Sequence, residues 1–453
     1  MPTRLLIISQ DIVGLTMAGP GIRYWQLARV LSRHVATTLA VPLADGQALA
    51  TLPPAGFDVA TYKRREWATL APVAAAADVC LLPSDIADEL PELAQLDACL
   101  VIDGYDPLMA EWLALSTGME DAVREAGWRQ RRVELASQLA IGDFFICASE
   151  RQRDWWLGLL EASGRINPAT YAADPSLRRL VDVVPYGLPG DPLPAPQPVI
   201  RGVWPGIGAN DRLLLWGGGL WPWLDPLTAV RATGILVARH PDLKLVFPGA
   251  RHPNPAMAGM PNQVEAARTL AGELGILDRA VFFGDWVAYS QWPHVLQEST
   301  LAISLHHETF ETRLAFRSRA LETIWAHLPS IVTAGDATAE LIGSYDLGAV
   351  VAPNDLDAVV AAADRLLQET PADRSQRFDA ACAALSWEQA AMPLLRLCQA
   401  PQRAPDRIGT PSATHDLTDA LRADRDRWRA LAQAYANGRI MRTLTRFQAY
   451  LRR

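Results

Sequence analysis

The stretch from Ser304 to Gly335 constrains the fold more than any other part of this sequence. The apolar run Leu301–Leu305 predicts a buried strand, a helix is expected to follow to about His327, and Ser330–Thr333 predicts the next strand. This order is typical of a βαβ unit, whose two strands lie parallel in one sheet. Because open α/β sheets bind ligands at the carboxyl ends of their strands, the residues directly after Leu305 are candidates for a binding site.

Charged side chains gather near the start of this helix. Glu311 and Glu322 flank Arg313, Arg317 and Arg319. Arg313 and Arg317 are four residues apart and would share one face of a continuous helix. Guanidinium groups at a helix N-terminus suit a phosphate group, and a carboxylate accepts several hydrogen bonds from sugar hydroxyls. The same charges would also fit surface ion pairs on an ordinary βαβ unit. The pattern alone leaves both interpretations open.

The composition excludes several classes of protein. At 453 residues the chain is long enough for two or three domains, and its net charge of −8 argues against nucleic acid as a partner. Five cysteines without a CxxC pair, and no stretch typical of a signal peptide, predict a cytoplasmic location. No apolar run approaches the roughly 20 residues that a membrane-spanning helix needs.

The amino-terminal half alternates short apolar runs with helical stretches, which predicts a largely parallel, doubly wound sheet. Its first run, Arg4–Ser9, leads into a glycine-rich loop and then a helix from about Ile22 to His34. Gly19 and Gly21 would let backbone approach a ligand closely at the carboxyl end of that strand. A flexible loop without a ligand is the alternative.

Two aspartates follow another predicted strand of this half. Asp103 and Asp106 stand at the end of the run Cys99–Asp103, where α/β enzymes place polar contacts to their ligands. Ordinary turn chemistry explains the same pair of residues, and the sequence favours that explanation.

The alternation restarts after a segment rich in proline and glycine. Arg212–Trp216 predicts a strand, Gly217–Gly219 a triple-glycine loop, and Asp225 with Pro226 the start of a helix. The predicted divisions are a first Rossmann-like domain at 1–187, a linker at 188–208, a second Rossmann-like domain at 209–400, a linker at 401–415 and a helical tail at 416–453. A cleft between the two domains is the expected ligand site.

The end of the tail combines an apolar face with five arginines and no acidic residue between Gly438 and Arg453. Such a segment suits an anionic membrane surface. A helix docked on this chain, or on a second copy of it, fits the pattern as well. The predicted partner of the tail is therefore either a membrane surface or a homodimer.

Several motifs occur in the order found in one enzyme family. They are AGPGIRYWQLARVL, VVPYGL, LLLWGGGLWPWLDP, LVFPG, VFFGDW, ETFETRLAFRSRALETIWAHLPSIVT and, later, Ala339–Glu340–Leu341. Together they resemble the motifs of the GT-B glycosyltransferases, specifically the retaining, GT4-like group. The resemblance covers about residues 4–400 and implies an α/β fold of two Rossmann-like domains facing a cleft.

The resemblance also implies roles for single residues. Glu311 corresponds to the carboxylate that contacts the donor sugar, and Glu322 to the one that contacts the nucleotide ribose. The family spaces these two residues eight apart, but Leu314 stands eight before Glu322, so Glu311 fits only with a short insertion and Glu308 competes for the role.

Other family residues are missing. The family's arginine and lysine near the glycine-rich loop are absent from 216–225, so Arg313 and Arg317 are expected to replace them, with His306 or Arg23 as further candidates. The family's frequent active-site histidine is also absent from the first domain, where Asp103 or Asp106 lies nearest to its place.

The sequence thus predicts a retaining glycosyltransferase that moves a sugar from a nucleotide-sugar donor to an acceptor hydroxyl, without a metal or other cofactor. The expected acceptor is a glycan or lipid-linked molecule of cell-surface glycan or glycolipid synthesis. The alternatives are a nucleotide-sugar epimerase of the same fold and a non-catalytic partner or scaffold. The candidate catalytic residues are Glu311, Arg313, Arg317 and Asp103, and the candidate substrate-binding residues are Gly19, Gly21, Arg23, Gly217, Gly218, Gly219, Gly249, His306 and Glu322.

Overall fold

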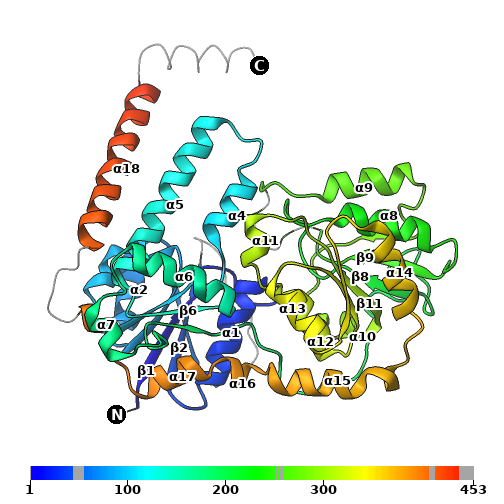
Figure 1. Ribbon diagram of the computed structural model, residues 1–453, viewed down its shortest axis with the longest axis horizontal. Coiled ribbons are helices and arrows are strands. Elements are labelled where there is room, and N and C mark those ends of the chain that lie inside the picture. Colours follow the sequence, from blue (N-terminus) through cyan, green and yellow to red (C-terminus); the bar gives the residue numbers. More distant parts are fainter. Residues whose placement is uncertain are drawn as a thin grey trace.

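Two parallel β-sheets with helices packed against them make up most of the chain (Figure 1). The computed structural model describes residues 2–43, 56–250, 252, 254, 257, 259–407 and 414–437. Every pairing between neighbouring strands in both sheets is parallel. The predicted α/β architecture of two Rossmann-like domains is confirmed.

The first sheet has seven strands in the order β3-β2-β1-β4-β5-β6-β7. Their bounds are β1 Arg4–Ile8, β2 Ala36–Pro42, β3 Asp58–Tyr62, β4 Val79–Pro83, β5 Cys99–Asp103, β6 Phe144–Cys147 and β7 Val181–Val183. The connecting helices are α1 Gly19–Leu31, α2 Trp67–Ala74, α3 Ile86–Glu89, α4 Leu108–Leu115, α5 Asp121–Ile141, α6 Glu150–Ala162 and α7 Pro168–Ala173. Strand β3 was not predicted from the sequence, because this edge strand has only short apolar side chains between polar ones.

The second sheet has six strands in the order β10-β9-β8-β11-β12-β13. Their bounds are β8 Arg212–Leu215, β9 Leu243–Phe247, β10 Val281–Phe283, β11 Ser299–Ser304, β12 Ser330–Thr333 and β13 Gly348–Val351. The main helices are α8 Pro226–Leu236, α9 Val264–Glu273, α10 Trp292–Glu298, α11 Phe310–Leu314, α12 Ser318–Trp325, α13 Ala337–Ser344, α14 Leu356–Leu366 and α15 Pro371–Ala384. The carboxylate of Asp225 accepts a hydrogen bond from the Thr228 amide at 3.0 Å, so the predicted cap of α8 is confirmed.

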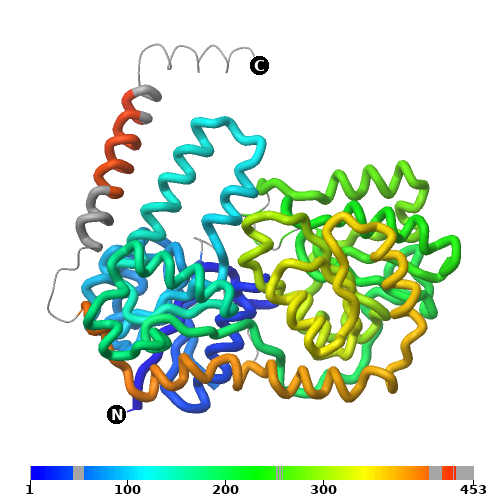
Figure 2. Tube along the Cα trace, in the orientation of Figure 1, coloured from blue at the N-terminus to red at the C-terminus, as the bar shows by residue number. Residues whose placement is uncertain are grey.

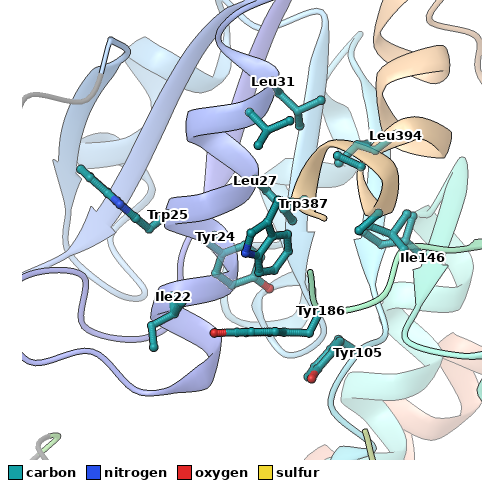
Figure 3. Close-up of a cluster of buried hydrophobic side chains, with 14 of the residues drawn as sticks. Ile22, Tyr24, Trp25, Leu27, Leu31, Tyr105, Ile146, Tyr186, Trp387 and Leu394 are labelled. Atoms are coloured by element: carbon teal, nitrogen blue, oxygen red, sulfur yellow. The ribbon is translucent and has the colours of Figure 1, made fainter. Parts of the chain in front are cut away.

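The chain returns to the first sheet after α15 (Figure 2). Helices α16, Trp387–Ala390, and α17, Met392–Gln399, fall within the predicted 209–400 domain but pack against the first sheet. Trp387 meets Tyr186 edge to face, with ring centroids 4.7 Å apart, in the apolar cluster shown in Figure 3. A side chain at Gly187 would lie 2.6 Å from the Cα of Trp387, so only glycine allows this approach.

Hydrogen bonds tie the two domains together on both sides of the cleft. Tyr105 donates to the carbonyl of Phe316 at 2.9 Å, and Gln152 donates to that of Leu314 at 2.8 Å. On the other side, the Tyr289 amide donates to the carbonyl of Leu15 at 2.8 Å. These contacts place α6 and the segment after β5 against the end of α11 and the start of α12, and they place the β1–α1 loop against the segment before α10.

The tail helix α18, Thr414–Asn437, lies along α5 (Figure 1). Asp424 accepts a hydrogen bond from Arg129 at 2.8 Å, and Arg425 donates to Asp88 at 2.7 Å. Helix α18 therefore packs against the first domain rather than standing apart from it. The arginine-rich residues 439–453 lie outside the described residues, and among those described no helix is long and apolar enough to cross a membrane.

Candidate functional site

A cavity of about 420 Å³ lies between the two domains, where the strands of both sheets end. Its second-domain wall consists of the Gly217–Gly219 loop, the start of α12 and several tryptophans, and its first-domain wall consists of the β1–α1 loop, the segment after β5 and helices α4 and α5. The sequence predicted a cleft at this place, and the described structure contains it.

The helix expected between Glu311 and His327 is two helices. Thr309 and Thr312 form a capping box that starts α11, and Ala315 leaves the helical conformation with ψ of 153°. Arg317 precedes α12, so Arg313 and Arg317 do not share a helix face, and that expectation is wrong. Arg313 is exposed and does not line the cavity, whereas Arg317 does.

Glu311 and Arg317 form a bidentate ion pair in the cavity wall. The two terminal nitrogens of the Arg317 guanidinium group each donate to the carboxylate of Glu311 at 2.8 Å. The Nε atom of Arg317 lies 3.5 Å from Asp336. Glu311 and Asp336 are both buried. A bidentate pair fixes the orientation of both groups, so the structure brings together two of the predicted catalytic residues.

A second ion pair lies beside the first. Arg319 donates to Glu322 at 2.7 Å, and Glu322 also accepts a hydrogen bond from the hydroxyl of Tyr186 at 2.7 Å. The guanidinium carbon of Arg319 stands 4.8 Å from the ring centroid of Trp292. Glu322 is buried behind Arg319 rather than lining the cavity, and Arg319 itself lines it. The sequence analysis did not select Arg319, although its position at a helix start, three residues before Glu322, was visible.

The glycines selected from the sequence divide into two groups. Gly217, Gly218 and Gly219 line the cavity, and the stem of Arg319 lies against the first two. Gly19 also lines it, and a side chain there would meet the hydroxyl of Ser318 at 3.2 Å. Gly249 backs the loop, since a Cβ atom there would lie 3.2 Å from the carbonyl oxygen of Gly218.

Gly21 has a different place. A Cβ atom at this position would lie 2.2 Å from the carbonyl oxygen of Ile12, and Gly21 does not line the cavity. This glycine therefore permits the close packing of the β1–α1 loop on α1.

Arg23 and Asp103 form a buried ion pair with each other. The guanidinium group donates to Asp103 at 2.7 and 3.1 Å and to the carbonyl of Val184 at 2.9 Å, and both side chains are almost fully buried. Neither lines the cavity. The pair joins α1 to the end of β5, a contact between residues 80 apart in sequence.

His306 is buried and lies 3.5 Å from Asp336. Burial, together with the nearby positive charge of Arg317, lowers the pKa of His306 to about 4. At neutral pH this imidazole is uncharged, so it does not supply the positive charge that the sequence analysis considered for it.

The first-domain wall contributes carboxyl groups. Burial and the neighbouring Asp103 raise the pKa of Asp106 to about 7. Burial, then the charges of Asp106 and Glu311, raise the pKa of Glu111 well above its ordinary value. From the sequence, Asp106 was a candidate site residue only as an alternative to Asp103, and Glu111 was not a candidate. Its place on α4, one turn after Asp106-Pro107, was the available signal.

Residues 207–382 match the family model described as Glycosyl transferases group 1. The second domain belongs to the group 1 glycosyltransferases. Several solved structures share the two-domain fold of this glycosyltransferase. Sucrose-phosphate synthase from Thermosynechococcus elongatus has a TM-score of 0.59 and 15% sequence identity, covering 87% of this chain and 98% of that one. WaaG, described as a glycosyltransferase involved in lipopolysaccharide biosynthesis, has a TM-score of 0.57 and 14% sequence identity, covering 88% of this chain and 100% of that one.

HepE from Anabaena, solved in complex with UDP-glucose, has a TM-score of 0.57 and 15% identity, covering 87% of this chain and 100% of that one. No curated protein matches the chain. At these identities the structural likeness shows the fold, and the family match covers the glycosyltransferase's second domain. The prediction of a GT-B glycosyltransferase of group 1 is confirmed.

Proposed function

We propose that this glycosyltransferase transfers a sugar from a nucleotide-sugar donor to an acceptor hydroxyl with retention of anomeric configuration. The observation that carries the proposal is the position of Arg317 and Arg319 at the start of α12, in the same cavity wall as the Gly217–Gly219 loop. Guanidinium groups and a helix N-terminus together suit a diphosphate. The solved structure of HepE with UDP-glucose supports a donor of this class.

Transfer requires breaking the bond between the anomeric carbon and the departing diphosphate oxygen. The acceptor oxygen forms a new bond to that carbon on the same face of the sugar, and its proton passes to the departing phosphate. Negative charge develops on the diphosphate, so positive groups fixed beside it lower the barrier. Arg319 and Arg317 supply this charge, and we propose that no metal ion is needed.

Each of the two carboxylates holds one arginine of the cavity wall. In the structure each arginine is paired, Arg317 with Glu311 and Arg319 with Glu322. We propose that Glu311 also accepts a hydrogen bond from the donor sugar and that Glu322 orients the ribose. A diphosphate arriving between the two guanidinium groups would then share cations that are already oriented, which reduces the entropy lost on binding.

The proposal is tested by incubating the purified protein with UDP-, GDP- and dTDP-sugars and following donor hydrolysis by chromatography. Slow release of the nucleoside diphosphate supports a transferase. Conversion of one nucleotide-sugar into its epimer supports the epimerase, which the two carboxyl groups of Asp106 and Glu111 in the first-domain wall make the second candidate. If the protein neither binds nor turns over any donor, the result contradicts both enzymatic functions and favours a scaffold.

We propose a cytoplasmic location and a role in cell-surface glycan or glycolipid synthesis. WaaG, a relative in fold, is described as acting in lipopolysaccharide biosynthesis. A lipid-linked acceptor would bring the enzyme to the membrane surface, where the arginines of residues 439–453 would meet anionic headgroups. A homodimer through the same tail is the competing proposal.

A further inference from the structure

The first-domain half of the cavity is built differently from the half that faces the Gly217–Gly219 loop. Its wall combines the carboxyl groups of Asp106 and Glu111 with the indole of Trp112 and the guanidinium groups of Arg64 and Arg131. Under the proposed function this half receives the acceptor, because the donor occupies the second domain. The charges and hydrogen bonds of this wall indicate what kind of acceptor it suits.

Both arginines of this wall are already engaged. Arg64 donates to Glu89 at 2.9 Å and to Asp85 at 2.9 Å. Arg131 donates to both carboxylate oxygens of Glu134, at 2.9 and 2.8 Å. Each guanidinium group is therefore neutralised by acidic neighbours, and no described residue lining this half offers an uncommitted positive charge to an anionic ligand.

The carboxyl groups, in contrast, are available. The side chains of Asp106 and Glu111 have no hydrogen-bond partner among the described residues, and both line the cavity. Burial raises the pKa of both groups, to about 7 for Asp106 and well above its ordinary value for Glu111, so the neutral form of each is favoured. A hydroxyl group pairs with either form, because it both donates and accepts. A phosphate group would lose its hydration here without meeting a free cation, because Arg64 and Arg131 are already paired.

Trp112 supplies an apolar surface. Its ring packs against Gly127, where a side chain would overlap it at 2.1 Å, and Arg131 lies over it at 5.3 Å from the centroid. Its Nε1 is buried without a hydrogen-bond partner. The C–H face of a sugar ring packs on an aromatic surface, so the partly exposed indole suits a saccharide.

We propose that the acceptor is an uncharged saccharide, whose hydroxyls bind Asp106 and Glu111, and that this half of the cavity rejects phosphorylated sugars. This inference rests on the proposed function. It also separates the protein from two relatives in fold whose names include a phosphate, sucrose-phosphate synthase and trehalose-6-phosphate synthase.

The test compares matched acceptors. Methyl glucoside, galactoside and mannoside and their 6-phosphates are added to the enzyme with the donor that it hydrolyses. At least one neutral glycoside is expected to accelerate donor consumption about tenfold more than its 6-phosphate, the effect of roughly 1.4 kcal/mol. A 6-phosphate that equals or exceeds its neutral partner, or a panel in which no neutral glycoside accelerates consumption, overturns the inference.

A charge change sharpens the result. Glu111→Lys should shift the preference at least about threefold toward the phosphorylated acceptor, because it replaces a carboxyl group of this wall with a cation. Glu161→Lys makes the same change on the exposed end of α6, outside the cavity lining, and should leave the ratio unchanged. An unchanged ratio in Glu111→Lys contradicts the assignment.

The donor experiment separates the two proposals. If no donor is consumed or bound, the proposed function fails. Saturation-transfer NMR with the same glycoside pairs still reports which member of each pair binds. Binding of the 6-phosphate alone, or loss of selectivity with an intact fold, would then overturn the acceptor inference independently.

Discussion

The two halves of the cavity differ in how their charges are arranged. On the second-domain side each arginine that lines the cavity is paired with a buried carboxylate, Arg317 with Glu311 and Arg319 with Glu322. On the first-domain side the arginines pair with acids of their own wall, and Asp106 and Glu111 are left facing the cavity. One half holds cations in fixed orientation for an anion, and the other presents hydrogen-bonding groups for a neutral molecule.

Under the proposed function, this difference would let one cavity take two kinds of ligand. The diphosphate of a nucleotide-sugar is the same whatever sugar it carries, so a rigid set of cations serves it. Acceptors vary, and helices α4 and α5, of which α4 lies beside α11 of the second domain, supply part of the first-domain wall (Figure 1).

The largest expected effect concerns a pair that lies behind the first-domain wall. Asp103→Ala would leave the buried Arg23 without its partner, so the free energy of unfolding should fall by about 3–5 kcal/mol. Chemical denaturation measures the loss. The double variant Arg23→Met, Asp103→Leu should recover much of it, because both charges are then gone. Lost turnover in Asp103→Ala with unchanged stability would instead support a catalytic role for Asp103.

The next prediction tests the second-domain half. Arg319→Ala should lower turnover about 10²–10³-fold, the scale seen when one group that stabilises developing negative charge is removed. Affinity for the nucleoside alone should change much less. Arg313→Ala is the comparison, because that side chain is exposed and outside the cavity lining. Equal losses in the two variants would contradict the assignment of the phosphate position.

Glu322 provides a smaller effect on the same side. Glu322→Gln keeps a hydrogen-bond acceptor for Tyr186 but removes the charge opposite Arg319. If Glu322 orients the ribose, calorimetry should show nucleotide affinity weakened by about 1–3 kcal/mol. A parallel melting curve shows whether the fold is intact. Unchanged affinity in a folded variant would remove Glu322 from the site.

The sequence predicted the architecture well because each strand and helix carries its own local pattern. The break between α11 and α12 could not be predicted from the sequence, because neither Ala315 nor Phe316 is a proline or a glycine. The partnership of Arg23 with Asp103 depends on the position of β5 relative to α1, which local spacing does not encode. Helices α16 and α17 likewise needed the folded structure to reveal that they return to the first sheet.

A pH series tests the first-domain half. The pKa of Asp106 is raised to about 7, above its value in an unfolded chain, so the folded state keeps a proton that the unfolded state releases. Stability from this group is complete below pH 4 and is lost as the pH rises toward 7, by at most about 1.4 kcal/mol per pH unit. Melting temperatures between pH 5 and 7.5 measure it, and Asp106→Asn should flatten the curve. A wild-type curve as flat as that of the variant would contradict the burial of this carboxyl group.

The smallest effect is expected for the tail, whose helix α18 braces α5 from the side away from the second domain (Figure 1). The ion pairs that α18 makes with α5 and α3 are partly exposed and are each worth only about 0.2–1 kcal/mol, so deleting residues 414–453 should lower stability by roughly 1–2 kcal/mol and leave both domains folded. Because α5 carries Arg131 into the first-domain wall, the deletion should also raise the acceptor KM more than the donor KM.

Flotation with anionic liposomes at low and high salt tests membrane contact of the same segment, and analytical ultracentrifugation tests a dimer. Five arginines near an anionic surface contribute about 1 kcal/mol each, so the membrane proposal requires binding at low salt. The proposal is contradicted if the full-length protein stays unbound at low salt and truncation converts it from a dimer to a monomer.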